Sequence, residues 1–281
     1  MKKILFVATL AALLPLLFAC GKVDDNKPHF DEPRFVQYAG QLVPRGGSLT
    51  PSSRALTPAA AASPVITFLE FTESGLYVLG RQIDGAVKYI SGTYSVSGDT
   101  YTLSGFGTAS FSKAMAGLVQ LTITPSGGAP ETLQADFKKA GSTDVAYRTW
   151  TIDKTRATIR GFHSPVSADF VGCNFDEMAK FLNDNGHKGD YLPSGSLKSI
   201  SFTGVNTLVF VFSDNSVDLG ECHISGDNVS FSWKGDTRLF EVENGKATIE
   251  YMDGKCVFTV DAALKGSTTS GSVTFVMSPL D

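Results

Sequence analysis

The sequence has little net charge and few of the residues that build catalytic or metal sites. Its formal net charge is −4 at pH 7, and no segment gathers lysine and arginine into a basic stripe. Because such a stripe is typical of nucleic-acid binding, we expect no nucleic-acid partner. A glycine-rich phosphate loop, a His-Glu-x-x-His motif and a nucleophile elbow are also missing. The four histidines have no metal-ligand spacing with one another or with cysteine; they are His29, His163, His187 and His223. We therefore expect no enzymatic activity, no cofactor and no metal.

Long apolar runs are missing too, except for one at the N-terminus. Lys2 and Lys3 precede an apolar stretch from Ile4 to Phe18. A membrane-spanning helix needs about 20 apolar residues, more than this stretch supplies, and Pro15 would disturb a helix within it. A basic start followed by a short apolar run and small residues is the plan of a signal peptide. We assign it to residues 1–19.

Cys20 follows this leader directly. The run Leu17-Phe18-Ala19-Cys20 resembles a bacterial lipobox, although Phe18 stands where that motif commonly has a small residue. The resemblance implies cleavage after Ala19, acylation of Cys20 and a membrane partner bound through the N-terminal lipid. Several acyl chains on one residue would hold the protein firmly. The alternative is an ordinary secretory leader that a cysteine happens to follow.

The residues after Cys20 bear on which side of the membrane the protein faces. Lys22, Asp24 and Asp25 resemble the export signal of surface lipoproteins in Bacteroidota. The resemblance implies an outer-membrane protein, lipid-anchored and displayed at the cell surface; the alternative is the periplasmic face. Charged segments that are poor in apolar residues also stay unpacked, so we interpret residues 20–33 as a lipidated tether.

The remainder of the chain predicts strands and turns rather than helices. Aromatic residues make up 11% of the sequence, with 28 glycines, and alternating segments are separated by short Ser-Gly-Asp, Asn-Gly and Asp-Gly turns that favour antiparallel neighbours. We divide it into a first β domain at 34–147, which contains a Pro/Ala/Ser-rich loop at 44–64, and a second β domain at 148–281. Strands are expected at 34–43, 65–72, 75–81, 87–96, 100–105, 118–124, 132–137, 149–160, 197–202, 207–213, 216–224, 228–233, 246–252, 255–264 and 271–277.

One helix is expected, at 174–185 in the second unit. Asn174 is suited to the N-cap, and Glu177 three residues later completes a capping box. Phe175, Met178 and Leu182 recur at helical spacing and form one apolar stripe. Gly186 then supplies a C-terminal stop.

The two units share a segment. Residues 92–103, which read GTYSVSGDTYTL, align with residues 220–231, which read GECHISGDNVSF. In both copies a Ser-Gly-Asp turn ends one alternating strand and begins another. The match favours duplication of a domain, although two unrelated hairpins with good turn chemistry would look similar.

This pattern resembles the lipocalin-like domains of Bacteroidota lipoproteins. The resemblance rests on the run 149–152 (TWTI), on 200–203 (ISFT) before an aromatic strand, and on 220–231. It covers most of the second unit and more weakly the first. It implies an all-β fold of two tandem antiparallel meander barrels or half-barrels, with the helix against one end. The inward positions of such a barrel are filled by side chains or enclose a small ligand.

Three cysteines remain besides Cys20. Cys222 and Cys256 share strand parity with apolar neighbours and should point into the second core. They could form a disulfide in an oxidising compartment or stay buried as free thiols, and the sequence leaves both open. Cys173, beside the helix start, is expected to be a packing residue.

These observations leave three function classes, of which an enzyme is the least favoured because no catalytic set is seen. The first is a non-enzymatic binding module for a small apolar ligand or a glycan. The second is a structural or adhesive surface protein such as a fimbrillin-like subunit, for which Arg34, Arg45 or Arg54 could be processing sites. A dry cavity of several hundred Å³ would favour a carrier, and a filled core would favour a scaffold. The sequence does not fix the oligomeric state.

Overall fold

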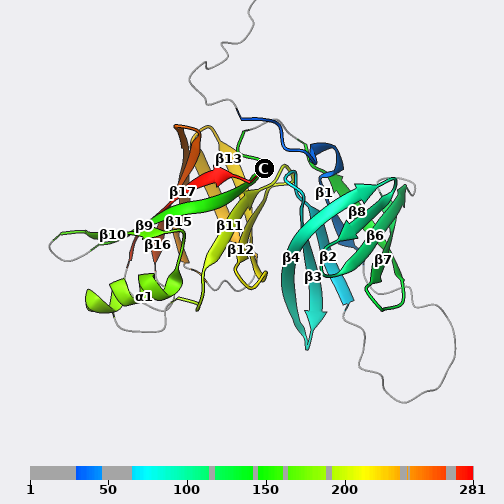
Figure 1. Cartoon of the computed structure of the whole chain (residues 1–281), viewed down its shortest axis with the longest axis horizontal. Helices are drawn as coiled ribbons and strands as arrows, with labels where there is room; N and C mark the ends of the chain where they lie inside the picture. Colours follow the sequence, from blue (N-terminus) through cyan, green and yellow to red (C-terminus); the bar gives the residue numbers. More distant parts are fainter. Residues whose placement is uncertain are drawn as a thin grey trace, which may run out of the picture.

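In the residues that it describes, the computed structural model contains two closed antiparallel β-barrels in tandem and one α-helix (Figure 1). The all-β prediction of two tandem barrels with one short helix is therefore confirmed. The structure describes residues 30–45, 65–113, 118–141, 145–160, 164–187, 192–234, 239, 241–263 and 270–280.

The first barrel is a simple meander in which each strand pairs with the next along the chain. Strand β1 then pairs with β8, which closes the ring at partners such as Gly40 and Lys139. The strands are β1 (Gly40–Pro44), β2 (Val65–Phe71), β3 (Leu76–Ile83), β4 (Ala86–Ser97), β5 (Thr100–Leu103), β6 (Gly107–Lys113), β7 (Leu118–Pro125) and β8 (Glu131–Lys139).

The second barrel closes through β9, which pairs with β17 along almost its whole length. The other edge of β9 is shared: residues 149–151 pair with β11, and residues 154–159 pair with β10. Its strands are β9 (Thr149–Ile159), β10 (Val166–Val171), β11 (Leu197–Phe202), β12 (Thr207–Phe212), β13 (Val217–Ser225), β14 (Asn228–Trp233), β15 (Glu241–Met252), β16 (Lys255–Ala263) and β17 (Ser270–Pro279).

Helix α1 (Phe175–Asp184) connects β10 to β11, at the place where those two strands diverge. The side chain of Asn174 accepts hydrogen bonds from the backbone N–H groups of Asp176 and Glu177, as an N-cap does. Gly186 has a φ of 88°, and this left-handed conformation ends the helix. The predicted helix and both of its end signals are confirmed. Its buried residues are Phe175, Met178 and Leu182.

Four strand predictions need correction. The expected strand 246–252 begins at Glu241, and the Asn-Gly turn expected at 244–245 lies within β15, where the pairing with β16 shifts register between Val242 and Ala247. The expected strand 34–43 begins only at Gly40, because residues Val36–Tyr38 form a 3₁₀ turn whose neighbour Phe35 packs on Tyr94 with ring centroids 5.0 Å apart. Strands β6 and β10 were not predicted. β6 consists mostly of small and polar residues, and the one buried residue of β10 is Phe170. Neither segment shows a strong alternation, so pairing with neighbours decides their conformation.

The repeated segment forms the same hairpin in each barrel. Strands β4 and β5 join at Gly98 with φ 57°, and β13 and β14 join at Gly226 with φ 60°. A second equivalence lies two turns earlier, between β2 and β3 and between β11 and β12. Thr72 and Thr203 each accept, on the side-chain oxygen, the backbone N–H four residues ahead. Both barrels therefore share two turns, which one further turn separates in each barrel.

Each barrel has its own core. The first is filled with aromatic and aliphatic side chains, and its rings form a continuous series in which Tyr101 lies 4.4 Å from Phe71 and 5.1 Å from Phe111 between centroids. The second core is centred on Trp150, Phe258 and Phe275, all at most 1% exposed. These side chains occupy the described interior of the first barrel.

The barrels dock through the outer faces of β2, β3 and β4 on one side and of β12 and β13 on the other. A third apolar cluster lies between them; it consists of Phe68, Leu76, Val78, Val209, Val211, Val217 and Leu219, with Tyr89 packed against it. Every residue of β12 is buried, which means that both faces of that strand are covered. A strand buried on both faces reads as a continuous apolar run, and the run Leu208–Phe212 shows that signal.

Candidate functional site

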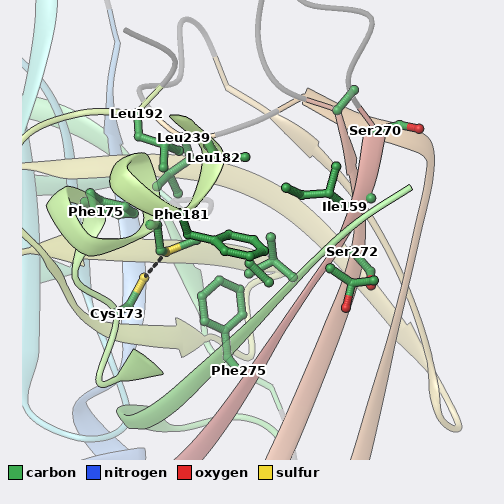
Figure 2. Close-up of a pocket in the computed structure, with 16 residues that line it drawn as sticks. Ile159, Cys173, Phe175, Phe181, Leu182, Leu192, Leu239, Ser270, Ser272 and Phe275 are labelled. Carbon is green, nitrogen blue, oxygen red and sulfur yellow. Dashed lines mark hydrogen bonds between the residues drawn. The ribbon is translucent and has the colours of Figure 1, made fainter. Parts of the chain in front are cut away.

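An apolar pocket lies in the second barrel, between helix α1 and the barrel interior (Figure 2). Its volume is about 60 Å³, where a single water molecule needs roughly 10–15 Å³. The walls are almost entirely apolar. Its apolar lining includes Ile159, Phe175, Met178, Leu182, Leu239 and Phe275.

Three parts of the fold build this pocket. Helix α1 contributes its apolar stripe, which was predicted from the helical spacing. Strands β9 and β17 contribute inward residues, with Ala157 and Ile159 on the first and Gly271 and Phe275 on the second. Figure 2 shows the rings of Phe181 and Phe275 pointing toward one another across the pocket. The strand residues were expected only as core, since nothing in their local sequence says that the helix leaves space above them.

Gly271 allows the pocket wall to form where β17 crosses β9. A Cβ atom at this position would lie 1.9 Å from the carbonyl oxygen of Thr158. No side chain fits there, so only glycine lets the two strands approach this closely. The close approach closes the barrel beside the pocket.

The groups that line the pocket are suited to contact an apolar molecule rather than to take part in a reaction. Cys173 lines it, and its thiol donates to the sulfur of Met178 at 4.0 Å. Burial raises the pKa of the Cys173 thiol to about 11, so the thiolate, which is the nucleophilic form, is scarce at neutral pH. A neutral thiol and a thioether behave as polarizable apolar groups.

The two cysteines predicted to point into the second core do so, and both are free. The disulfide considered between Cys222 and Cys256 is therefore not formed in the structure, and the alternative of two buried thiols is what it contains. Burial raises the pKa of Cys222 to about 12 and raises that of Cys256 further above its usual range. Cys173 is a packing residue, as expected.

The predicted lipidation and export residues precede the described part of the chain. Cys20, Lys22, Asp24 and Asp25 all lie before Phe30, the first described residue. Phe30 itself, which we had included in the tether, packs on the second core, with its ring 5.3 Å from that of Trp150. The end of the predicted tether is therefore attached to the second barrel. The Pro/Ala/Ser-rich loop lies outside the described residues from position 46 onward.

Two open grooves lie elsewhere on the described surface. One, of about 820 Å³, runs between the barrels beside Tyr89, Lys88 and Lys234. The other, of about 410 Å³, lies beside Arg34 and Arg148. Both have linings of mixed polarity, whereas the pocket under α1 is almost entirely apolar, as specific ligand sites mostly are. Neither displaces the pocket under α1 as the best candidate.

Within the described ranges, no helix combines the length and apolarity needed to cross a membrane. The same part of the chain contains no group of three or more His, Cys, Asp or Glu side chains placed to hold a metal ion.

Comparison with known proteins leaves the family open. No family model and no curated protein matches this chain. Among solved structures, it is similar to the crystal structure of Burkholderia oklahomensis agglutinin, with 10% sequence identity over 85% of this chain and 94% of that chain and a TM-score of 0.19. A superposition of that quality carries no argument about fold or function.

Proposed function

We propose that the protein is a non-enzymatic binding module whose second barrel holds the apolar part of a small ligand beneath helix α1. The observation that carries this proposal is the apolar pocket lined by α1, β9 and β17. The first barrel, with its filled core, serves as a scaffold in this proposal.

The size of the pocket limits the ligand. Sites that enclose a whole drug-sized ligand measure about 300–1,000 Å³, and this pocket measures about 60 Å³. One apolar group, such as the end of an acyl chain or a small ring, is therefore what the pocket takes, and the remainder of the ligand lies outside. An apolar wall favours such a group over a glycan, since sugar hydroxyls would lose their hydrogen bonds there.

A binding measurement tests this proposal. The uncharged fluorescent probe N-phenyl-1-naphthylamine should bind a chain that begins at Gly21 and should be displaced by a fatty acid. Ala157→Leu adds volume to the pocket wall and should weaken probe binding at least tenfold. Ala86→Leu makes the same change on the exposed β3–β4 hairpin of the first barrel and should leave binding unchanged.

Native mass spectrometry of the protein from its host completes this test. A co-purified apolar molecule that the Ala157→Leu variant lacks supports the carrier. Equal probe binding by both variants, or no binding by the wild type, rejects it and favours the structural or adhesive alternative.

We also propose that Cys20 anchors this module in the outer membrane and that Lys22, Asp24 and Asp25 direct it to the cell surface. Cys20→Ser should abolish acylation and release the protein from membranes. Alanine at the other three positions should leave it lipidated but protected from protease added to intact cells. If Cys20→Ser remains on membranes, Cys20 is not the anchor. If protease removes the triple alanine variant and the wild type from intact cells equally, the three charged residues do not direct surface display.

A further inference from the structure

Two glutamates of the first barrel are buried against the second barrel. Glu70 lies on β2 and is 0% exposed, and Glu73 lies in the following turn and is 4% exposed. Both face the turn between β11 and β12, which contains Gly204 and ends at Thr207. A buried carboxylate is costly unless its charge is paired or fully hydrogen-bonded.

Each carboxyl group is hydrogen-bonded on one oxygen only. Oε2 of Glu70 accepts from Thr207 Oγ1 and from Gln41 Nε2, both at 2.9 Å. Oε1 of Glu73 accepts from the backbone N–H of Gly204 at 2.8 Å. The second oxygen of each, Oε1 of Glu70 and Oε2 of Glu73, is buried and has no hydrogen-bond partner. Each carboxyl group therefore has one hydrogen-bonded oxygen and one buried oxygen without a partner. In this arrangement the protonated, neutral form is more stable than the charged form.

The charged and titratable groups around this pair do not neutralise it. They are Tyr94 on β4, Lys138 on β8, Cys222 on β13 and Lys234 after β14. Lys138 donates to the carbonyl oxygen of Val205 at 3.0 Å, and Lys234 is exposed, so its charge is screened by solvent. Among the described residues, no lysine or arginine forms an ion pair with Glu70 or Glu73.

We propose that the contact between the two barrels is a proton-binding site, in which Glu70 and Glu73 take up protons from solvent as the barrels dock and release them as the barrels separate. Separation hydrates both carboxyl groups and lets them ionise at their ordinary pKa. Burial has the corresponding effect in the docked state: it raises the pKa of Glu73 to about 7 and raises that of Glu70 as well.

The direction of the pH effect follows from this. The docked form binds more protons than the separated form, so low pH favours docking and rising pH through about 7 weakens it. The apolar cluster around Val209 and Val211 is unaffected by pH and keeps the barrels in contact. Deprotonation therefore increases opening of the interface without unfolding either barrel. This inference is independent of the proposed apolar ligand.

Backbone amides at the interface report on both steps. The Gly204 N–H donates to Glu73 itself, so its chemical shift should follow ionisation of that carboxyl group. The N–H of Thr149 donates to Ser74 Oγ, and that of Ser91 donates to the carbonyl of Asn215; both bonds cross the interface. In a ¹⁵N-labelled chain that begins at Gly21, we expect the Gly204 amide to titrate with a midpoint near 7. Protection of Thr149 and Ser91 from hydrogen exchange, corrected for intrinsic rates, should fall on the order of 10- to 100-fold between pH 5.5 and 8.5.

Two variants separate this effect from general pH sensitivity. Glu73→Gln carries a neutral side chain of the same shape and leaves Glu70 in place, so the pH-dependent fall in protection of the interface amides should become smaller than in the wild type. Glu250→Gln removes an exposed carboxylate of β15 and should behave as the wild type. The wild-type titration decides the question even if Glu73→Gln fails to fold. A Gly204 midpoint below 5, or protection of Thr149 and Ser91 that does not change with pH, overturns the proposal.

Discussion

The ring of Phe30 meets the indole of Trp150 edge to face, with centroids 5.3 Å apart and planes at 89°. The guanidinium of Arg148 lies over both rings, 5.0 Å from the centroid of Phe30 and 5.6 Å from that of Trp150. The indole Nε1 donates to the carbonyl of Ala146 at 3.1 Å. The start of the described chain is therefore fixed on the second core before the chain enters the first barrel.

Replacement of Trp150 should be among the most damaging single changes. The indole is 0% exposed, so Trp150→Ala leaves a large cavity. It also removes the contacts of the indole with Phe30 and Arg148. We expect a loss of about 3–5 kcal/mol in the free energy of unfolding, measured by urea denaturation. Trp233→Ala truncates the same residue type at a partly exposed position and should cost less. Equal losses for the two variants would contradict the central position of Trp150.

A fragment from Tyr147 to Asp281 tests whether the barrels are separate folding units. It keeps the complete ring from β9 to β17, so we expect a β-rich circular dichroism spectrum and cooperative unfolding. It also exposes Val209, Val211 and Leu219, which the first barrel covers. The fragment should therefore self-associate, since apolar patches of this kind drive association.

Val211→Thr together with Leu219→Thr should reduce that association, as measured by analytical ultracentrifugation. A fragment that is unfolded while the longer chain is folded would show that the second barrel depends on the first.

The repeated hairpin predicts a backbone effect at Gly226. Its φ is 60°, and a Cβ atom there would meet nothing within 4 Å. Gly226→Ala should thus cost only the strain of a left-handed residue, about 1–2 kcal/mol, and Gly226→Asn should cost less because asparagine tolerates that region. Gly141→Ala is the matched control, since space is also open there and no left-handed φ is required. Thermal unfolding of the three variants measures these differences, and a control that loses as much as Gly226→Ala would refute the explanation.

The three described cysteines should be inert in the folded protein. All are buried and free, and burial raises the pKa of each. In a chain that begins at Gly21, a thiol reagent such as dithiobis(nitrobenzoate) should label none of the three under native conditions. In denaturant without reductant it should label all three. Labelling of only Cys173 after unfolding would show instead that Cys222 and Cys256 are paired.

The buried Glu73 should make overall stability depend on pH. Its folded pKa, about 7, is raised above the unfolded value. Its contribution is therefore fully present below the unfolded pKa and is lost as pH rises through about 7. The unfolding free energy of the wild type should fall by on the order of 3 kcal/mol between pH 5 and pH 9 relative to Glu73→Gln. Denaturant titrations at several pH values measure this, and parallel curves for the two proteins would count against it.

The sequence by itself determined the local elements, because their signals are short-range. Asn174 and Gly186 mark the two ends of helix α1, and Gly98 and Gly226 mark the two equivalent hairpins. Turn chemistry of this kind acts within a few residues, so it can be read without knowledge of distant partners. The tandem all-β architecture follows from the same signals together with strand alternation.

The tertiary structure alone decided closure, docking and the pocket. Closure of the second barrel depends on Gly271 passing Thr158, two positions far apart in the chain. The interface places Glu70 against Thr207, although a lone glutamate within the apolar run Val65–Phe71 and the unbroken run Leu208–Phe212 were both visible in the sequence. Alternation tells which face of a strand is buried, but only the partner strand shows what covers it. The space under helix α1 exists because the helix stripe and the inner faces of β9 and β17 do not fill the end of the barrel between them, which is a property of their packing and not of any one segment.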